Sequence, residues 1–197
     1  PLETGDQGLD FRLLGQEVII SRTGYTGELG YEIYSSSTEV SLLWKKLLED
    51  TRVKPAGLGC RDTLRLEMGY PLYGHDLDQE HSPLEAGLDR FVDFSKDFLG
   101  KDALMRLPRQ GGQKRLIFFT ADSRRSPRQG FGIYSQNRRI GVVTSGSFSP
   151  SLCVGIGMGY VEAPLAVGEK IAVKEGATEI AVTVARKPFY TRGSAQS

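Results

Sequence analysis

The sequence predicts an α+β protein whose first part mixes strands and helices and whose second part is all β. Apolar residues before residue 108 recur at both strand and helix spacing, whereas helical periodicity disappears after residue 113. Short β-branched runs separated by Gly, Pro, Ser and Asn then follow. The segment 108–113, rich in Pro and Gly, separates the two parts. We therefore predict two domains, at residues 1–108 and 113–197.

The first domain is predicted to begin with a β-hairpin. Residues 10–20 and 29–34 have the composition of strands, and the glycines of segment 24–30 are typical of a wide turn between them. Because side chains alternate along a strand, Glu32 is expected on the opposite face from Tyr31.

Helices are predicted after the hairpin. Ser36 and Glu39 have the spacing of a capping box, which would start the first helix. Its apolar residues repeat at helical spacing and predict a stripe that faces a core: Val40, Leu43, Trp44, Leu47 and Leu48. Further helices are predicted at residues 58–68, from Ser82 onward, and at 101–107.

The second domain is predicted to contain short strands joined by turns. The strands are expected at residues 114–121, 132–136, 138–146, 154–161, 169–175 and 178–187. Short strands at such regular intervals indicate a small antiparallel barrel or sandwich.

Composition excludes several classes of protein. An apolar content of 39% and a net charge of +1 are those of an ordinary globular chain, and they give no reason to expect binding to nucleic acid or to an anionic membrane. No apolar run approaches the roughly 20 residues that span a bilayer. Cys60 and Cys153 do not suggest a disulfide framework, so we expect a reducing compartment, the cytoplasm. Because the first residue is Pro1, we expect the chain to be part of a longer protein.

A cluster of potential metal ligands crowds one loop: His75, Asp76, Asp78, Glu80 and His81. Carboxylates and imidazoles bind divalent ions, but the cluster lacks the spacing of a zinc-binding helix or of a calcium loop. We interpret it as a solvated, hydrogen-bonded polar loop and expect no metal. The chain also lacks a nucleophile elbow, so nucleophilic catalysis has little support.

Arg61 and Glu32 are the stronger candidates for a ligand site. An arginine grips a carboxylate or the acceptor edge of a planar ring with two hydrogen bonds, and a carboxylate receives two parallel donors in the same way. Tyrosines are available as walls of such a pocket, at positions 25, 31, 34, 70 and 73. The residues alone leave a second interpretation equally open, namely that Glu32 and Arg61 form a structural ion pair.

Several segments together resemble the aminomethyltransferase family, the T-protein of the glycine cleavage system. They are SRTGYTGELGYEIY (21–34), PAGLGCRDTLRLEMGYPLYGHDLD (55–78), SPLEAGL (82–88), TSGSFSPSL (144–152) and KPFYTRG (187–193). Each is short, but their order and spacing make a chance match improbable. The resemblance covers almost all of the chain, which corresponds to about the C-terminal half of a family member.

The resemblance implies a mixed α/β folate-binding part followed by a C-terminal antiparallel β-barrel domain. It also implies that tetrahydrofolate binds in a central cavity. Glu32 falls on the glutamate that grips the pterin, and Arg61 falls on a second folate contact. Tyr25 and Tyr70 fall on aromatic positions that border the cavity, and Arg192 lies in a terminal segment that approaches the folate.

The family's reaction gives the expected activity and partners. An aminomethyl group on the lipoyl arm of a carrier protein, the H-protein, is transferred to tetrahydrofolate, ammonia leaves, and 5,10-methylene-tetrahydrofolate forms. The family's catalytic aspartate belongs to an N-terminal half that matches nothing here, so the catalytic residues stay unassigned. We expect this chain alone to be inactive and an N-terminal half or a partner chain to complete the cavity.

Three other functions remain open at this stage. Relatives of the same fold bind folate without catalysing a reaction, and others act as folate-dependent demethylases or oxidases. In a purely structural protein, the carboxylate at position 32 would be an ordinary ion-pair partner and the tyrosines would only pack.

Overall fold

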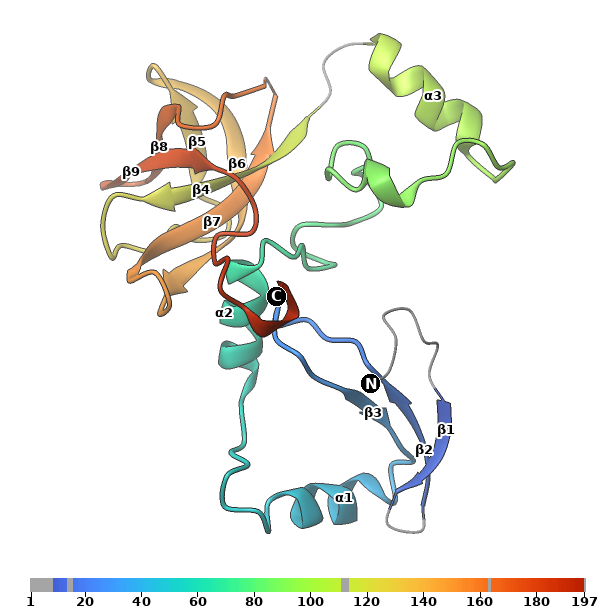
Figure 1. Ribbon diagram of the computed structural model, residues 1–197. Helices are drawn as coiled ribbons and strands as arrows, with labels where there is room; N and C mark the ends of the chain where they lie inside the picture. The colour runs from blue at the N-terminus through green and yellow to red at the C-terminus, as the bar shows by residue number, and fades with distance from the viewer. Residues whose placement is uncertain (1–8, 14–15, 111–113, 163, 197) are drawn as a thin grey trace. The chain divides into compact units, whose positions relative to one another are not determined.

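The computed structural model describes residues 9–13, 16–110, 114–162 and 164–196 (Figure 1). The chain separates into two compact units. The first comprises Pro1–Leu64 and Thr191–Ser197, and the second comprises Arg65–Tyr190. In the part of the chain that is described, no helix has the length and apolar composition needed to cross a membrane.

The division between the units falls within a helix, α2 (Leu58–Glu67), after Leu64. The predicted linker at 108–113 begins inside another helix, because α3 (Lys101–Gln110) continues through its proline. The missing N–H of a proline near a helix end removes one hydrogen bond, which this helix tolerates. Since residues 111–113 lie outside the described ranges, a domain boundary there stays a prediction.

The first unit contains a three-stranded antiparallel sheet in the order β1-β2-β3: β1 (Leu9–Leu13), β2 (Gln16–Ser21) and β3 (Glu32–Tyr34). The predicted hairpin across the glycine segment is confirmed, since Ser21 of β2 pairs with Glu32 of β3. The prediction of one strand at residues 10–20 is wrong, because this segment forms two strands, β1 and β2. They pair with each other and so satisfy their backbone hydrogen bonds.

Helix α1 (Val40–Leu47) follows the sheet, but the predicted capping box is wrong. The Ser36 hydroxyl donates to a carboxylate oxygen of Glu39 at 2.8 Å, and no side chain caps the helix. The two side chains therefore satisfy each other rather than the free backbone N–H groups. The N–H groups of Glu39 and Val40 instead donate to the carbonyl of Ser36, both at 3.1 Å.

The apolar stripe of α1 does not face a core. No residue of the helix is buried, and the side chains of Val40, Trp44 and Leu47 are exposed. Among residues 17–64 and 191–195, the part of the first unit for which burial is described, Val18 is the only buried apolar side chain. The three strands, α1 and the first part of α2 supply too little surface to enclose such a stripe, and this is why the prediction of a core contact is wrong.

The second unit contains a closed antiparallel barrel in the strand order β4-β7-β6-β5-β8-β9. The strands are β4 (Arg115–Ala121), β5 (Gly132–Ser135), β6 (Arg138–Ser149), β7 (Val154–Val161), β8 (Lys170–Glu175) and β9 (Thr178–Ala185). All six predicted strands are present, and the barrel resolves the choice between barrel and sandwich. Gln136 and Asn137 connect β5 to β6 with φ of 49° and 63°, the left-handed geometry of a tight hairpin turn.

Strand β7 separates two apolar cores. Its glycines face the barrel interior, where a Cβ added at Gly157 would lie 2.6 Å from the Phe119 ring. The interior is filled by Ile117, Phe119, Ala121, Ile133, Val143, Val161, Ile171, Val173, Ile180, Val182 and Val184. The alternate residues of β7 belong to the second core, with members Leu66, Leu116, Phe118, Ile156, Met158 and Tyr160. The C-terminal end of α2 therefore packs on the outside of the barrel.

Helix α2 ends at a glycine in the left-handed conformation. Gly69 adopts a φ of +65°, its N–H donates to Leu66 at 2.8 Å, and the N–H of Tyr70 donates to Arg65 at 2.9 Å. This pair of bonds is a Schellman motif, which satisfies the last carbonyls of a helix.

The helix predicted from Ser82 is wrong, because the chain forms only a turn there. Ser82 and Glu85 exchange reciprocal backbone-to-side-chain hydrogen bonds of 2.9 and 3.3 Å, as a capping box does. Gly87, with a φ of +65°, then reverses the chain after a single turn, and the N–H of Leu88 donates to Pro83 at 2.8 Å. The start signal is real, but the glycine stops the helix at once.

The exposed stripe can be tested with Trp44, the single tryptophan, whose side chain is 50% exposed. We expect red-shifted emission that acrylamide quenches almost as readily in the folded protein as in denaturant. Blue-shifted, protected emission at all protein concentrations would contradict the exposed placement of α1.

Candidate functional site

The loop that joins β2 to β3, residues 22–31, is the centre of the candidate site, and we call it the glycine loop (Figure 1). The guanidinium carbon of Arg61 lies 5.0 Å from the centroid of the Tyr25 ring, within the roughly 6 Å of a cation–π contact. Tyr25 is half-buried and Arg61 is exposed. Two predicted site residues, far apart in sequence, thus come together in the first unit.

Glu32 stands where the glycine loop enters β3, and its side chain is half-buried. Its carboxylate accepts a hydrogen bond from the hydroxyl of Thr23. Within the described part of the chain, Glu32 and Arg61 form no ion pair with each other, so the structural salt bridge considered above is not found. A carboxylate has about four acceptor positions, and among the described residues only the Thr23 hydroxyl bonds to that of Glu32.

The C-terminal segment lies against the glycine loop (Figure 1). The N–H of Ser194 donates to the Glu28 carboxylate at 2.9 Å, and the N–H of Leu29 donates to the Ser194 hydroxyl, also at 2.9 Å. The exposed Arg192 precedes these contacts by two residues. The segment of Arg192 is therefore adjacent to the loop that carries Tyr25.

Tyr70 belongs to the second unit, whereas the other four predicted site residues belong to the first. It is half-buried and follows the glycine that ends α2. Its carbonyl accepts a hydrogen bond from Nη1 of Arg65 at 3.2 Å. Its role beside a ligand stays a prediction.

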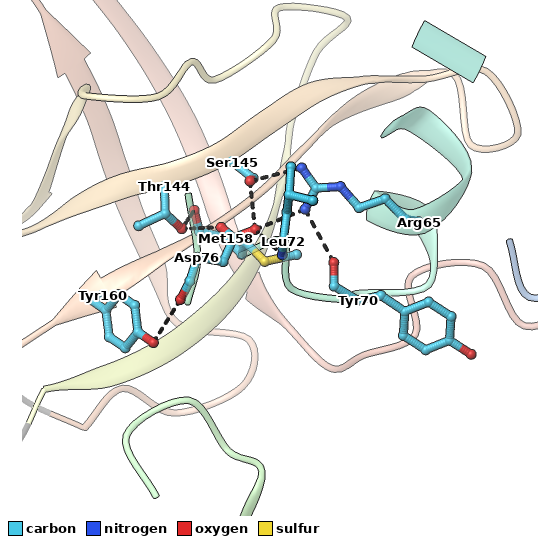
Figure 2. A network of polar contacts seen from close by, with 8 residues as sticks. All are labelled: Arg65, Tyr70, Leu72, Asp76, Thr144, Ser145, Met158 and Tyr160. Carbon is cyan, nitrogen blue, oxygen red and sulfur yellow. Dashed lines mark hydrogen bonds and ion pairs between the residues drawn. The ribbon is translucent and has the colours of Figure 1, made fainter. Parts of the chain in front are cut away.

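One residue of the loop considered as a metal site, Asp76, forms a buried ion pair with Arg65 of α2 (Figure 2). Asp76 is fully buried, so our interpretation of the whole loop as solvated is wrong at this residue. Nη1 of Arg65, itself 2% exposed, lies 2.9 Å from the Asp76 carboxylate. That carboxylate also accepts from the hydroxyls of Thr144 and Ser145 and from the N–H of Leu72.

These contacts occupy the Asp76 carboxylate and explain why it tolerates burial. A buried charge is stable only when a partner and hydrogen bonds replace its lost hydration. In the described part of the chain, no group of three or more His, Cys, Asp or Glu side chains is arranged to hold a metal ion.

Two of the remaining polar residues of that loop, Asp78 and His81, fit the hydrogen-bonded interpretation. Nδ1 of His81 lies 2.8 Å from the Asp78 carboxylate, and this contact is the main cause that holds the pKa of Asp78 below its usual value. The His81 ring stacks on Tyr160, with 3.9 Å between the ring centroids.

Glu67 is a buried acidic residue that the sequence did not single out. Its carboxylate accepts from the Ser149 hydroxyl at 2.5 Å and from the N–H of Ser151 at 3.0 Å. Its carbonyl accepts from the N–H groups of Phe189 and Tyr190 at 2.9 and 3.0 Å. The signal in the sequence for this burial was the position of Glu67 between two apolar residues, Leu66 and Met68, in the predicted helix. Glu67 thus fastens the chain shortly before Arg192.

Comparison with known proteins assigns both parts of the chain to one class of protein. A profile described as GCVT N-terminal domain matches residues 8–96, and one described as glycine cleavage T-protein C-terminal barrel domain matches residues 114–191. The fold is therefore that of a glycine cleavage T-protein.

Relatives and a solved structure agree with this class. An aminomethyltransferase from Halothermothrix orenii is 50% identical over 90% of this chain, and one from Alkaliphilus oremlandii is 44% identical over 94%. The crystal structure of the glycine cleavage system aminomethyltransferase T from Bartonella henselae superposes with a TM-score of 0.83 at 34% identity, over 89% of this chain and 50% of that one. The chain belongs to the aminomethyltransferase family. It spans about half the length of the curated relatives it matches, 51% and 52% for these two.

The buried pair predicts that replacing two neighbouring aspartates will lower the free energy of unfolding by very different amounts. We expect Asp76→Ala to lower the free energy of unfolding by about 3–5 kcal/mol, because it leaves the Arg65 charge buried without its partner. The matched change Asp78→Ala, at an exposed carboxylate, should cost about 1 kcal/mol or less. Urea denaturation followed by circular dichroism measures both, and equal losses would contradict the structural role of the pair.

Proposed function

We propose that this chain contributes part of the folate site for aminomethyl transfer to tetrahydrofolate in the glycine cleavage reaction. The observation that carries the proposal is the set of contacts that the Glu32 and Arg61 side chains make. Both belong to the first unit, and among the described residues they form no ion pair with each other. The carboxylate has only a threonine hydroxyl as its described partner, and the guanidinium lies over a tyrosine ring. Both groups are therefore available to a polar aromatic ligand.

The chemistry of the ligand matches these groups. The pterin of tetrahydrofolate presents a ring N–H beside an exocyclic amine, and a carboxylate accepts two such parallel donors in one plane. We assign this contact to Glu32. Arg61 and Tyr25 would offer the ring a flat cationic and aromatic wall. Folate also carries carboxylates, for which the exposed Arg192 is a suitable partner.

We infer that the reaction needs parts outside these residues. The donor would be the aminomethylated lipoyl arm of the H-protein, and ammonia would leave as the one-carbon unit reaches folate. The chain's own groups bind and orient the acceptor, and none of them is assigned to move a proton. A polypeptide equivalent to the unmatched half of the relatives would supply the catalytic acid, and the cytoplasm would be the setting.

A non-catalytic folate-binding protein and a folate-dependent demethylase would use the same pterin contacts. The long matches to aminomethyltransferases favour transfer to folate over both. The assays below separate binding from catalysis.

Titration with 5-formyl-tetrahydrofolate tests the pterin contact. We expect Glu32→Ala and Arg61→Ala each to weaken binding by about 1–3 kcal/mol, since each leaves ligand groups without partners. This corresponds to roughly 5- to 150-fold in Kd. Glu49→Ala, which removes an exposed carboxylate paired with Lys46, is the matched control and should bind like the unchanged chain. Equal binding by the unchanged chain and Glu32→Ala would remove the proposed contact.

An assay of glycine cleavage separates an enzyme from a binding module. With aminomethylated H-protein and tetrahydrofolate, we expect the chain alone to release no ammonia above the level of carrier without chain. Release should begin when a polypeptide equivalent to the missing half of the relatives is added. Full activity of the chain alone would contradict the proposed division of the site.

A further inference from the structure

The contact between the C-terminal segment and the glycine loop is built from reciprocal hydrogen bonds. Ser194 donates through both its N–H and its hydroxyl to the Glu28 carboxylate, and its hydroxyl accepts from the N–H of Leu29. The N–H of Ala195 adds a bond of 3.2 Å to the carbonyl of Gly27. One short terminal segment thus satisfies three successive residues of the glycine loop.

The contact also requires a close approach of two backbones. Gly193 is buried, and a Cβ built on it would lie 2.5 Å from the carbonyl oxygen of Gly27. Gly27 itself has a φ of +73°, a conformation that glycine adopts without strain. The approach therefore depends on glycine at both positions. Such a fit is more specific than a surface hydrogen bond between two long side chains.

Arg192 lies between two fastened points of the sequence. On its C-terminal side, Gly193 and Ser194 meet the glycine loop, as described above. On its N-terminal side, the N–H groups of Phe189 and Tyr190 donate to the carbonyl of Glu67 in the second unit. Since consecutive Cα atoms are about 3.8 Å apart, the Arg192 backbone cannot move far from the loop while Gly193 is in place.

We propose that Glu28 is a positioning residue, which latches the Gly193–Ser194 segment onto the glycine loop and thereby holds Arg192 beside the folate site. This inference rests on the proposed function. Glu28 would not touch the ligand, and its effect on binding would pass through Arg192. The two hydrogen bonds from Ser194 keep the pKa of Glu28 below its usual value, so the carboxylate stays charged in neutral solution.

Hydrogen exchange of the ligand-free protein tests the latch itself. We expect Glu28→Ala and Ser194→Ala to speed amide exchange in peptides that cover residues 24–31 and 191–196, with exchange in the barrel strands unchanged. Ser194→Thr, which keeps the hydroxyl, should restore slow exchange. Glu49→Ala is the control for loss of an exposed carboxylate in the same unit. Exchange that is unchanged in both alanine variants would overturn the latch.

A double-mutant cycle with Arg192→Ala tests the positioning role, with Kd for 5-formyl-tetrahydrofolate as the readout. We expect Glu28→Ala to weaken binding about 3- to 10-fold when Arg192 is present and to have no effect in the Arg192→Ala background, since coupled residues are not additive. Equal losses in both backgrounds, or faster exchange without any loss of affinity, would overturn the positioning role. If the unchanged chain does not bind the ligand, the proposed function fails together with the positioning role, while the exchange experiment still decides whether the latch exists.

Discussion

The buried ion pair between Arg65 and Asp76 is the constraint on which the second unit depends. Neither charge is stable in an apolar interior by itself, so each requires the other and a full set of hydrogen bonds. The bonds to Asp76 come from β6 and from the loop after α2, through Thr144, Ser145 and Leu72. The pair therefore fixes the end of α2, the following loop and the barrel wall with one arrangement of atoms (Figure 2).

The sequence predicts those elements that are determined by neighbouring residues. The barrel strands follow from short β-branched runs separated by turn residues, and the helix predicted at 58–68 is present as α2. Helix starts are less secure, as two serine–glutamate pairs with the same spacing show. Ser36 and Glu39 bond to each other beside a helix, whereas Ser82 and Glu85 bond as a capping box before a single turn. The residues that follow, and not the motif itself, decide the outcome.

The candidate site shows the same difference between features that local motifs predict and features that only the folded chain decides. The family motifs single out Glu32 and Arg61, and the structure adds that they form no salt bridge with each other in the described chain. The burial of Asp76 and Glu67 was not predicted because their partners are distant in sequence. Ser145 follows Asp76 by 69 residues, and Ser149 follows Glu67 by 82. No local pattern records such a pairing, because burial is decided by the folded barrel.

Strand β7 has a consequence for how the second unit loses its structure. Its glycines line the barrel interior, while Ile156 and Met158 belong to the core that includes Leu66 of α2. A single strand is thus a shared wall between two apolar compartments. Neither compartment can open without exposing a face of the other, so the barrel and the helix end are thermodynamically coupled and behave as one cooperative folding unit.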